Sequence, residues 1–414
     1  MAVAPIPLEL VELIISFLHP GSLNPLNGEG NFLNKSSAST TAKCALVCRA
    51  WLPPSRRILF YRVHIGKYQA YGFAQLFTRP DRLTFLPFIR EVAFQPGIAQ
   101  HTWMQSVFKR KLAKHFPPSV ETLVLEGFSS EKPTPEALHC PAFTGITRFE
   151  LRGSWNLALS EAVKCIASFP VLEVLEVNLA LELDQTRLPA PADQPAATLR
   201  SATFIGRGVQ PVVAWVQASE VAVSALRFSV TDMVAGHQFI TSIVQYTAQQ
   251  GPLLSSLSLA FEGPNLEERG HALLLRDFLK HNTRLKTLTI KASLAQIVSI
   301  ILSAINRHAL PELEVLRIIV QEPITQNDLA AQPFWRTYYA APREPHYREL
   351  DRLLEPHAVL RRLIVAHFPH YGPELRAPES ELKASVMEAM PLCVARGVVE
   401  VDPEPEGDSS FWWL

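Results

Sequence analysis

The stretch LKTLTIKASLAQIVSIILSAI, residues 285–305, contains the two periodicities that decide the fold. Its first part places Leu285, Leu288 and Ile290 in the spacing L-x-x-L-x-L. The last two of these apolar residues are two apart, as a strand with one buried face requires. Its second part has the spacing of an amphipathic helix, with apolar residues at Leu294, Ile297, Val298, Ile301, Leu302 and Ile305. The stretch therefore predicts a strand followed directly by a helix.

The same L-x-x-L-x-L spacing recurs along the chain, with Val, Ile, Phe or Ala in place of some leucines. The other copies are Ile89, Val92, Phe94; Val120, Leu123, Leu125; Ile146, Phe149, Leu151; Leu172, Leu175, Val177; Leu199, Ala202, Phe204; Val223, Leu226, Phe228; Leu254, Leu257, Leu259; Leu313, Leu316, Ile318; and Leu360, Leu363, Val365. Middle positions of successive copies are 24 to 31 residues apart, except for a last step of 47. Most of these steps lie near the period of leucine-rich repeats, about 20–29 residues.

Strands and helices that alternate at a near-constant pitch predict an α/β solenoid, with a parallel sheet on its concave side and helices outside. We expect this leucine-rich-repeat-like domain over residues 86–401, with a last strand within 395–401 and a tail over 402–414. Insertions are expected at 183–197 and 321–346. A doubly wound α/β domain is the alternative. It is disfavoured because no Gly-rich phosphate loop follows any strand, and because the strands have one buried face rather than two.

Composition limits the class of protein. The chain has 414 residues, 48% of them apolar, and its 39 basic and 39 acidic residues balance. A balanced charge argues against a strongly basic nucleic-acid binder, so we expect no nucleic-acid partner. The five scattered cysteines fit a reducing compartment better than a disulfide framework.

No apolar run approaches the roughly 20 residues that cross a bilayer. The first apolar run contains Glu9 and Glu12 and has no basic residue before it, unlike a signal peptide. We therefore expect a cytoplasmic or nuclear protein that does not bind a membrane.

The first 64 residues predict a separate helical module, joined by a linker over 65–85 to the repeats. A helix is expected over residues 6–18, followed by a loop over 21–41 that is rich in Gly, Asn and Ser. A second helix is expected over 42–51, where two prolines follow. A third helical turn then runs into an extended piece that ends near Val63.

Three blocks of this segment resemble the F-box. That family has a Leu-Pro-x-Glu helix ending in Ile-x-x-x-Leu, then a Leu-Val-Cys-Arg-x-Trp block, then a Leu-Phe pair. The matching residues are Pro7, Glu9, Ile14, Leu18, Leu46, Val47, Cys48, Arg49, Trp51, Leu59 and Phe60. The chain departs from the pattern at Ile6, where the family has Leu, and by an insertion of about twenty residues between the first two blocks. With its degenerate repeats, the whole chain is similar to a group of F-box proteins that is numerous in mushroom-forming fungi.

The resemblance implies a substrate-recognition subunit whose three-helix module docks on the Skp adaptor of a ubiquitin ligase and, through it, on a cullin. The implied adaptor-binding residues are Pro7, Leu10, Ile14, Leu18, Leu46, Val47, Cys48, Trp51, Leu59 and Phe60. The alternative is a free-standing repeat scaffold for a protein partner, in which the N-terminal helices only cap the array. A cap explains the apolar stripe of residues 6–18 but not the Leu-Val-Cys-Arg-x-Trp block.

Outward positions of the predicted strands offer a surface to a protein substrate that the sequence does not identify. The candidates are Glu126, Glu150, Arg152, Glu176, Arg227, Thr289, Lys291 and Arg317. They carry both signs of charge, so they do not indicate which charge the substrate has.

Motifs for catalysis are missing from the sequence, which contains no G-x-S-x-G, no G-x-x-x-x-G-K-[ST] and no H-E-x-x-H. We therefore expect no enzymatic activity, no cofactor and no metal site. His367 and His370 are close in sequence, but Pro369 between them argues against a metal site. The terminal segment 411–414, Phe-Trp-Trp-Leu, either folds back onto the last repeat, which we favour, or is a short motif that a partner binds.

Overall fold

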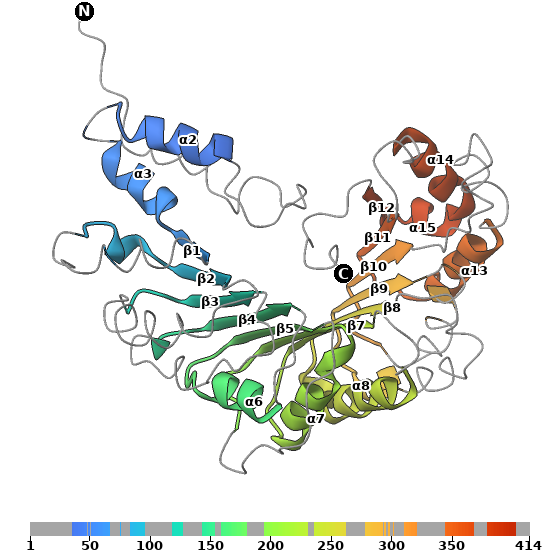
Figure 1. Ribbon diagram of the computed structural model, residues 1–414. Coiled ribbons are helices and arrows are strands. Elements are labelled where there is room, and N and C mark those ends of the chain that lie inside the picture. The colour runs from blue at the N-terminus through green and yellow to red at the C-terminus, as the bar shows by residue number, and fades with distance from the viewer. Residues whose placement is uncertain are drawn as a thin grey trace, which may run out of the picture. The chain divides into compact units, whose positions relative to one another are not determined.

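The computed structural model of the protein describes residues 35–47, 49, 51–66, 75, 83–95, 118–126, 143–153, 159–179, 194–230, 236–261, 278–292, 294, 297–298, 301, 310–320, 344–367 and 379–402. The chain divides into two compact units, named here unit 1 (Met1–Leu199 with Glu406–Leu414) and unit 2 (Arg200–Pro405). Figure 1 labels the elements of both units.

Unit 1 contains five strands within its described residues, each parallel to the next in chain order (Figure 1). They are β1 (Arg62–Gly66), β2 (Glu91–Gln95), β3 (Thr122–Glu126), β4 (Arg148–Gly153) and β5 (Val174–Leu179). The register keeps the apolar positions of neighbouring strands in line, so Leu123 lies between Val92 and Phe149. Each repeat therefore adds one strand to the edge of the previous repeat, as a linear repeat array requires.

Unit 2 continues the same pattern with seven described strands. They are β6 (Ser201–Ile205), β7 (Ala225–Val230), β8 (Ser256–Phe261), β9 (Thr287–Ala292), β10 (Val315–Val320), β11 (Arg362–His367) and β12 (Val399–Asp402). They too are parallel and in chain order, and Leu288 lies between Leu257 and Leu316. The strand predicted within 395–401 is β12, which pairs with β11.

The apolar positions of all the predicted copies form the core of the two units. No residue of these copies exposes more than 4% of its surface, so the prediction of a parallel α/β repeat array is confirmed at this level. The weakest copy is buried as well as the others, since Ala202 is fully buried and Phe204 stacks on Phe228 with ring centroids 5.6 Å apart. Burying a large aliphatic or aromatic side chain contributes about 1.5–3 kcal/mol.

A repeated backbone contact fixes the point where each strand begins. One carbonyl accepts two N–H groups from the next repeat: Arg90 O accepts from Glu121 N (2.8 Å) and Thr122 N (2.9 Å). In unit 2, Ser255 O accepts in the same way from Lys286 N (2.9 Å) and Thr287 N (3.0 Å). These paired bonds satisfy backbone donors that would otherwise be left without a partner and hold neighbouring repeats in one register.

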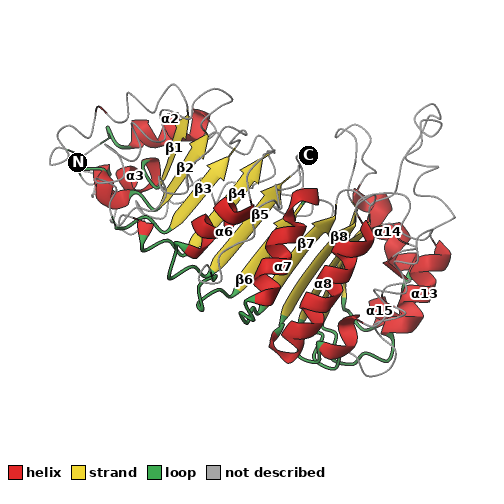
Figure 2. Cartoon of the chain, turned by 60° about the horizontal axis from the view of Figure 1, so that its bottom comes forward, coloured by secondary structure: helices red, strands yellow, loops and turns green. Residues whose placement is uncertain are grey.

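Helices cover one face of the strands in both units (Figure 2). In unit 1 the described helix on this face is α6 (Leu159–Ala167), in which Leu159, Val163 and Ile166 have the spacing of one helical face. In unit 2 the helix predicted to follow β9 is confirmed at Leu294, Ile297, Val298 and Ile301, which are helical and buried. Residues 302–309 lie outside the described part of the chain.

The sequence did not predict two longer elements of unit 2, α7 (Gln210–Ala218) and α8 (Gly236–Gln250). The 3-10 turn η6 (Arg207–Val209) precedes α7 and η7 (Gly251–Leu253) follows α8 in the chain, and η9 (Phe278–His281) contacts α8. The last residue of α8, Gln250, is buried and bonded at both ends of its amide. Its Oε1 accepts from Val223 N (2.9 Å) and its Nε2 donates to Val221 O (3.1 Å). These two hydrogen bonds therefore join the end of α8 to the loop that precedes β7.

Three helices close unit 2: α13 (Glu344–Leu354), α14 (Glu379–Ala389) and α15 (Pro391–Ala395). The carboxylate of Asp351 in α13 accepts from Leu392 N (2.9 Å) and Cys393 N (2.8 Å) at the start of α15. In return, the guanidinium of Arg396 donates to Leu354 O (2.8 Å) and three further carbonyls after α13. The Asp351 carboxylate lies at the positive start of α15, and the Arg396 guanidinium lies at the negative end of α13. These two residues therefore join α13 to α15.

The N-terminal segment differs from the prediction. A helix, α2 (Lys35–Cys44), occupies part of the region predicted as loop (21–41), and it ends within the region predicted as helix (42–51). Ser and Thr dominate α2 and suggested a loop, but packing against α3 (Leu52–Leu59) outweighs their weak helix preference. The two prolines lie in the first turn of α3, where their missing N–H groups are not needed.

β1 also changes the expected domain boundary. The predicted module ends at residue 64, which is inside β1, and β1 pairs with β2 along its whole length. Phe60 stacks on Phe85, with ring centroids 4.8 Å apart, beside the turn η2 (Leu86–Phe88). The extended piece that was expected after α3 is therefore the first strand of the sheet.

Candidate protein-binding surfaces

In each unit, the open face of the sheet is the face formed by the residues that alternate with the buried apolar positions. All eight predicted substrate-binding residues occupy such positions. Unit 1 contributes Glu126, Glu150, Arg152 and Glu176, and unit 2 contributes Arg227, Thr289, Lys291 and Arg317. The alternation of side chains along a strand was sufficient to place them on this face.

On unit 1, two arginines of β4 connect two glutamates. Arg152 Nη2 lies 2.7 Å from Glu150 Oε2 and 3.1 Å from Glu176 Oε1. Arg148 Nε lies 2.6 Å from Glu150 Oε1, and its Nη2 lies 3.4 Å from Glu176 Oε2. Both glutamates expose only 7% of their side chains. Each buried carboxylate is thus held by two guanidinium groups, and the four residues form one closed ion-pair network.

Burial and charge oppose each other in this network. Burial alone would lower the pKa of Arg152, but the carboxylates of Glu150 and Glu176 keep that pKa above its ordinary value. For Glu126, burial outweighs the attraction of Arg152 and raises the carboxyl pKa. Burial also raises the pKa of Glu91, although Arg62 lies 2.9 Å from it. The open face of unit 1 therefore contains carboxyl groups whose ionisation is opposed by burial, and arginines that favour the ionised form.

On unit 2, one row of residues crosses the open face of five adjacent strands. The register aligns them in the order Thr203, Arg227, Ser258, Thr289 and Arg317. Each of the five is partly exposed. The row contains three hydroxyl groups and two guanidinium groups, all of which are hydrogen-bond donors.

Two acidic residues of β12 form ion pairs with arginines of this face. Asp402 Oδ2 lies 2.9 Å from Arg317 Nη2, and Glu400 Oε2 lies 2.7 Å from Arg362 Nη2. Lys291 belongs to the next row of the face and exposes only 2% of its surface. A partner on this face would therefore contact the row from Thr203 to Arg317 rather than the lysine itself.

The N-terminal segment presents a second type of surface. Leu46 exposes 85% and Val47 exposes 62% of its surface. They lie in the turn after α2, where Leu46 N donates to Lys43 O (3.0 Å) and Val47 N donates to Cys44 O (3.1 Å). We call these two residues the exposed pair. Together they form an exposed apolar surface that another protein could cover.

The other predicted adaptor-binding residues that are described take part in the chain's own packing. Trp51 packs against the buried Ile58, Leu59 is partly buried, and Phe60 stacks on Phe85. The remaining five lie outside the described residues: Pro7, Leu10, Ile14, Leu18 and Cys48.

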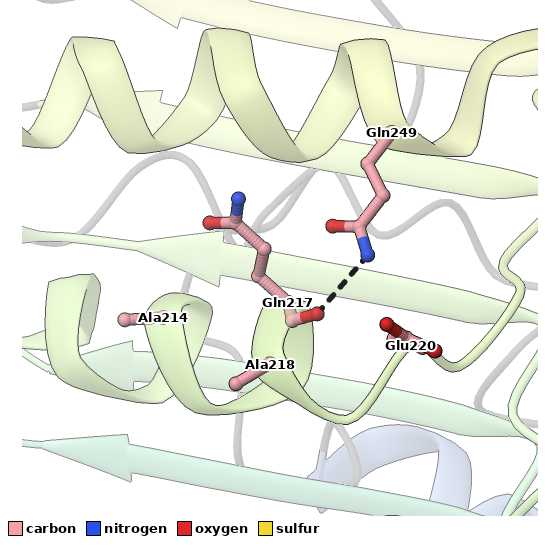
Figure 3. Close-up of a pocket in the computed structure, with 5 residues that line it drawn as sticks. All are labelled: Ala214, Gln217, Ala218, Glu220 and Gln249. Atoms are coloured by element: carbon pink, nitrogen blue, oxygen red, sulfur yellow. Dashed lines mark hydrogen bonds between the residues drawn. The ribbon is translucent and has the colours of Figure 1, made fainter.

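A depression on the helical face of unit 2 lies where α7 and α8 meet (Figure 3). It is lined by Ala214, Gln217, Ala218, Glu220 and Gln249, and Gln249 Nε2 donates to Gln217 O (3.2 Å). Glu220 adopts a positive φ of 54° after the end of α7, a conformation that ends helices. The five residues supply one carboxylate and two amides but neither a histidine nor a nucleophile, so this depression suggests no reaction.

Two searches of the described part of the chain gave negative results. It contains no group of three His, Cys, Asp or Glu residues that could hold a metal ion. None of its helices has the length and apolar character that crossing a membrane requires.

The sequence analysis overlooked several residues of these surfaces: Arg148, Thr203, Ser258, Arg362, Glu400 and Asp402. The signal that would have found most of them is the same one that found the strands. Arg148, Thr203, Ser258 and Arg362 each lie next to a residue of the L-x-L pair and so must share the open face.

Comparisons with known proteins add little. The chain matches no protein-family model and no curated protein. Among solved structures it is similar to a protein from Bacteroides fragilis, with a TM-score of 0.40 and 11% sequence identity over 89% of this chain and 82% of that one. A likeness at that level assigns neither a fold nor a function.

Proposed function

We propose that the protein is a substrate-recognition subunit of a Skp–cullin–F-box ubiquitin ligase. The N-terminal segment docks on the Skp adaptor, and the open face of the repeats binds a protein substrate. In this role the chain catalyses no reaction and works in the cytoplasm or the nucleus. It holds the substrate near a ubiquitin-loaded enzyme and so raises the effective concentration of one relative to the other.

The observation that carries the proposal is the exposed pair. Leu46 and Val47 belong to the Leu-Val-Cys-Arg-x-Trp block that resembles the F-box, and they expose 85% and 62% of their surfaces. Covering an aliphatic side chain of this size stabilises a complex by about 1.5–3 kcal/mol, and a few such anchors carry most of the energy of an interface. Trp51, in the same block, packs against Ile58 inside the module, so the block contains both core residues and exposed residues.

The test is capture of the full-length protein by a purified Skp adaptor. The variant Leu46→Glu with Val47→Glu places two charges on the exposed pair while leaving Trp51 and Ile58 in place, so it is expected to weaken adaptor binding by about a hundredfold or more. The matched control is Leu253→Glu, because Leu253 in η7 of unit 2 exposes 55% of its surface. The control is expected to bind as the wild type does. Wild-type binding by the double variant would refute the proposal.

One observation favours the alternative, a repeat scaffold capped by its N-terminal helices. α3 is joined to the array through the stacking of Phe60 on Phe85 and through Arg56 Nη1, which donates to Thr84 Oγ1 (3.3 Å). A pure cap predicts that the wild-type protein does not bind the adaptor at all. The same capture experiment therefore separates the two functions.

A further inference from the structure

The N-terminal segment carries charges of one sign over a long stretch of an otherwise neutral chain. Residues 30–80 contain no aspartate or glutamate, although a stretch of this length would contain about five at the chain's average of 39 acids in 414 residues. Helices α2 and α3 lie within this stretch. Its eight basic residues are Lys35, Lys43, Arg49, Arg56, Arg57, Arg62, Lys67 and Arg79.

The structure shows which of these cations have an acidic partner. Arg62 Nε, in the first strand of the sheet, lies 2.9 Å from Glu91 Oε1. Lys43, Arg49 and Arg57 are exposed, and within the described part of the chain none of the three forms an ion pair. The N-terminal segment therefore presents positive charges to solvent that its own chain does not neutralise.

Two of these three cations flank the exposed pair. Lys43 lies in the last turn of α2, where its carbonyl accepts the N–H of Leu46 (3.0 Å). Arg49 follows Val47 by two residues. An apolar centre with a polar rim is the usual composition of a protein interface. We call these four residues the docking surface; its centre is aliphatic and its charged members are both cations.

The packing of the segment does not explain the charges. Its described core is Ile58 with Trp51 and Cys44 packed against it, all of them uncharged side chains. Like charges in one small module repel one another, so they do not stabilise its fold. Exposed charges of one sign instead attract a partner of the opposite sign, and such steering can raise an association rate by about ten- to a thousandfold.

We infer that the docking surface binds an acidic surface of the Skp adaptor, with Lys43 and Arg49 as its charged contacts. The exposed pair slows dissociation of the complex, and the two cations speed its formation. This inference rests on the proposed function, to which it adds the chemistry of the partner's surface.

The first test needs no substitution. The full-length protein binds to immobilised adaptor in a surface plasmon resonance experiment while the salt concentration rises from about 0.1 to about 1 M, which shortens the Debye length from about 10 to about 3 Å. The association rate constant is expected to fall by about tenfold and the dissociation rate constant to change by less than about threefold. An association rate constant that does not fall would overturn the inference and leave the proposed function standing.

Variants locate the charges. Lys43→Glu with Arg49→Glu is expected to lower the association rate constant at about 0.1 M salt by about tenfold or more, and to weaken its dependence on salt. The matched control is Arg284→Glu with Lys286→Glu, which reverses two exposed cations in the loop before β9 of unit 2. The control is expected to lower this constant by less than about threefold.

A conservative variant separates charge from side-chain shape. Lys43→Arg with Arg49→Lys keeps both charges and is expected to associate as the wild type does. Circular dichroism checks that each variant is folded. Unchanged association of the folded Lys43→Glu, Arg49→Glu variant, or an equal loss in the control on unit 2, would overturn the inference.

A further variant removes the apolar centre without changing the charge. Leu46→Ser with Val47→Ser is expected to raise the dissociation rate constant by about tenfold or more and to change the association rate constant by less than about threefold. Adaptor binding that does not depend on salt defeats this inference alone, whereas a wild type that does not bind the adaptor refutes the proposed function and this inference with it. A single-stranded deoxythymidine oligonucleotide that binds the wild type more tightly than the adaptor does would mean that the cations recognise nucleic acid, and would also overturn the inference.

Discussion

The open faces of unit 1 and unit 2 have the same backbone framework but different side-chain chemistry. In both units the strands are parallel and in chain order, and the L-x-L positions are buried. In unit 1 the open face places Glu150 and Glu176 beside Arg148 and Arg152, within hydrogen-bond distance. In unit 2 it presents a row of hydroxyl and guanidinium groups, of which Arg317 is paired with Asp402.

This difference shows which part of a repeat determines the fold and which part is free to change. The apolar face must fit its neighbours, so substitution there leaves a cavity or an overpacked core. The partly exposed positions of the open face do not have this constraint and can carry either internal pairs or residues that bind a partner. Unit 1 pairs two arginines with two glutamates on this face, whereas unit 2 has hydroxyl and guanidinium groups at partly exposed positions.

The largest loss of stability is predicted for a variant of unit 1. Arg152→Met removes one of the two cations from Glu150 and Glu176, whose side chains expose only 7%. Removing one member of a buried network leaves charges without compensation, so the free energy of unfolding should fall by about 2–3 kcal/mol. Urea denaturation followed by circular dichroism measures the change.

The control in unit 2 is Arg317→Met. Its acid partner Asp402 exposes 20% of its side chain, against 7% for Glu150 and Glu176. The expected loss is about 1 kcal/mol or less. Equal losses for the two variants would mean that the unit 1 network stabilises the sheet no more than an ordinary surface pair does.

A second prediction concerns the way in which unit 2 stabilises a buried acid. Asp351 exposes 2% of its surface, and its carboxylate accepts backbone N–H groups of α15 rather than facing arginines. Asp351→Ala leaves the N–H groups of Leu392 and Cys393 without their acceptor, so the free energy of unfolding should fall by about 2 kcal/mol. Denaturation of the full-length protein measures it.

Burial, together with the nearby Asp351 carboxylate, raises the pKa of the Cys393 thiol to about 12. The Asp351→Ala variant should therefore also lower this pKa toward its ordinary value, which can be followed by thiol reactivity. Glu355→Ala, one residue beyond α13 and exposed, is the matched control and should change stability by less than about 0.5 kcal/mol. A loss in that control as large as in Asp351→Ala would contradict a specific role for the aspartate.

Periodicity was enough to predict the sheet. Every L-x-x-L-x-L copy lies at a strand, including the copy at Leu199, Ala202 and Phe204, because the spacing records a burial requirement that each repeat meets locally. The helix predicted after β9 was found for the same reason, since Leu294, Ile297 and Ile301 are helical and buried. α2 was not, because its Ser-rich sequence has little helix preference of its own and depends on packing against α3.

The sequence predicted which residues share the open face but not how they pair. The contacts of Arg148 and Arg152 with Glu176 join residues on neighbouring strands, and the contact of Arg317 with Asp402 spans 85 positions in the chain. Such pairs depend on the register between repeats, which a single copy of the pattern does not contain. The exposed pair was predicted through a resemblance to a family, and its exposure depends on the turn that ends α2 at Cys44.

The smallest predicted change in stability has opposite signs on the open faces of unit 1 and unit 2. Burial raises the pKa of Glu126 above the ordinary carboxyl value of 4.5, so the folded protein binds the proton more tightly than the unfolded chain does. The stability that this proton provides is present below the ordinary pKa and is lost as pH rises through the raised value. Glu126→Gln, which is neutral at every pH, should therefore be more stable than the wild type at pH 7, by under about 1 kcal/mol. This advantage should shrink on acidification.

The matched variant on unit 2 is Glu400→Gln, which removes an exposed ion pair with Arg362. It should lower the free energy of unfolding by about 0.3 kcal/mol at pH 7. Thermal denaturation of both variants across pH 4 to 7 tests the opposite signs, and a stabilising Glu400→Gln or a destabilising Glu126→Gln would mean that burial does not govern the acids of unit 1.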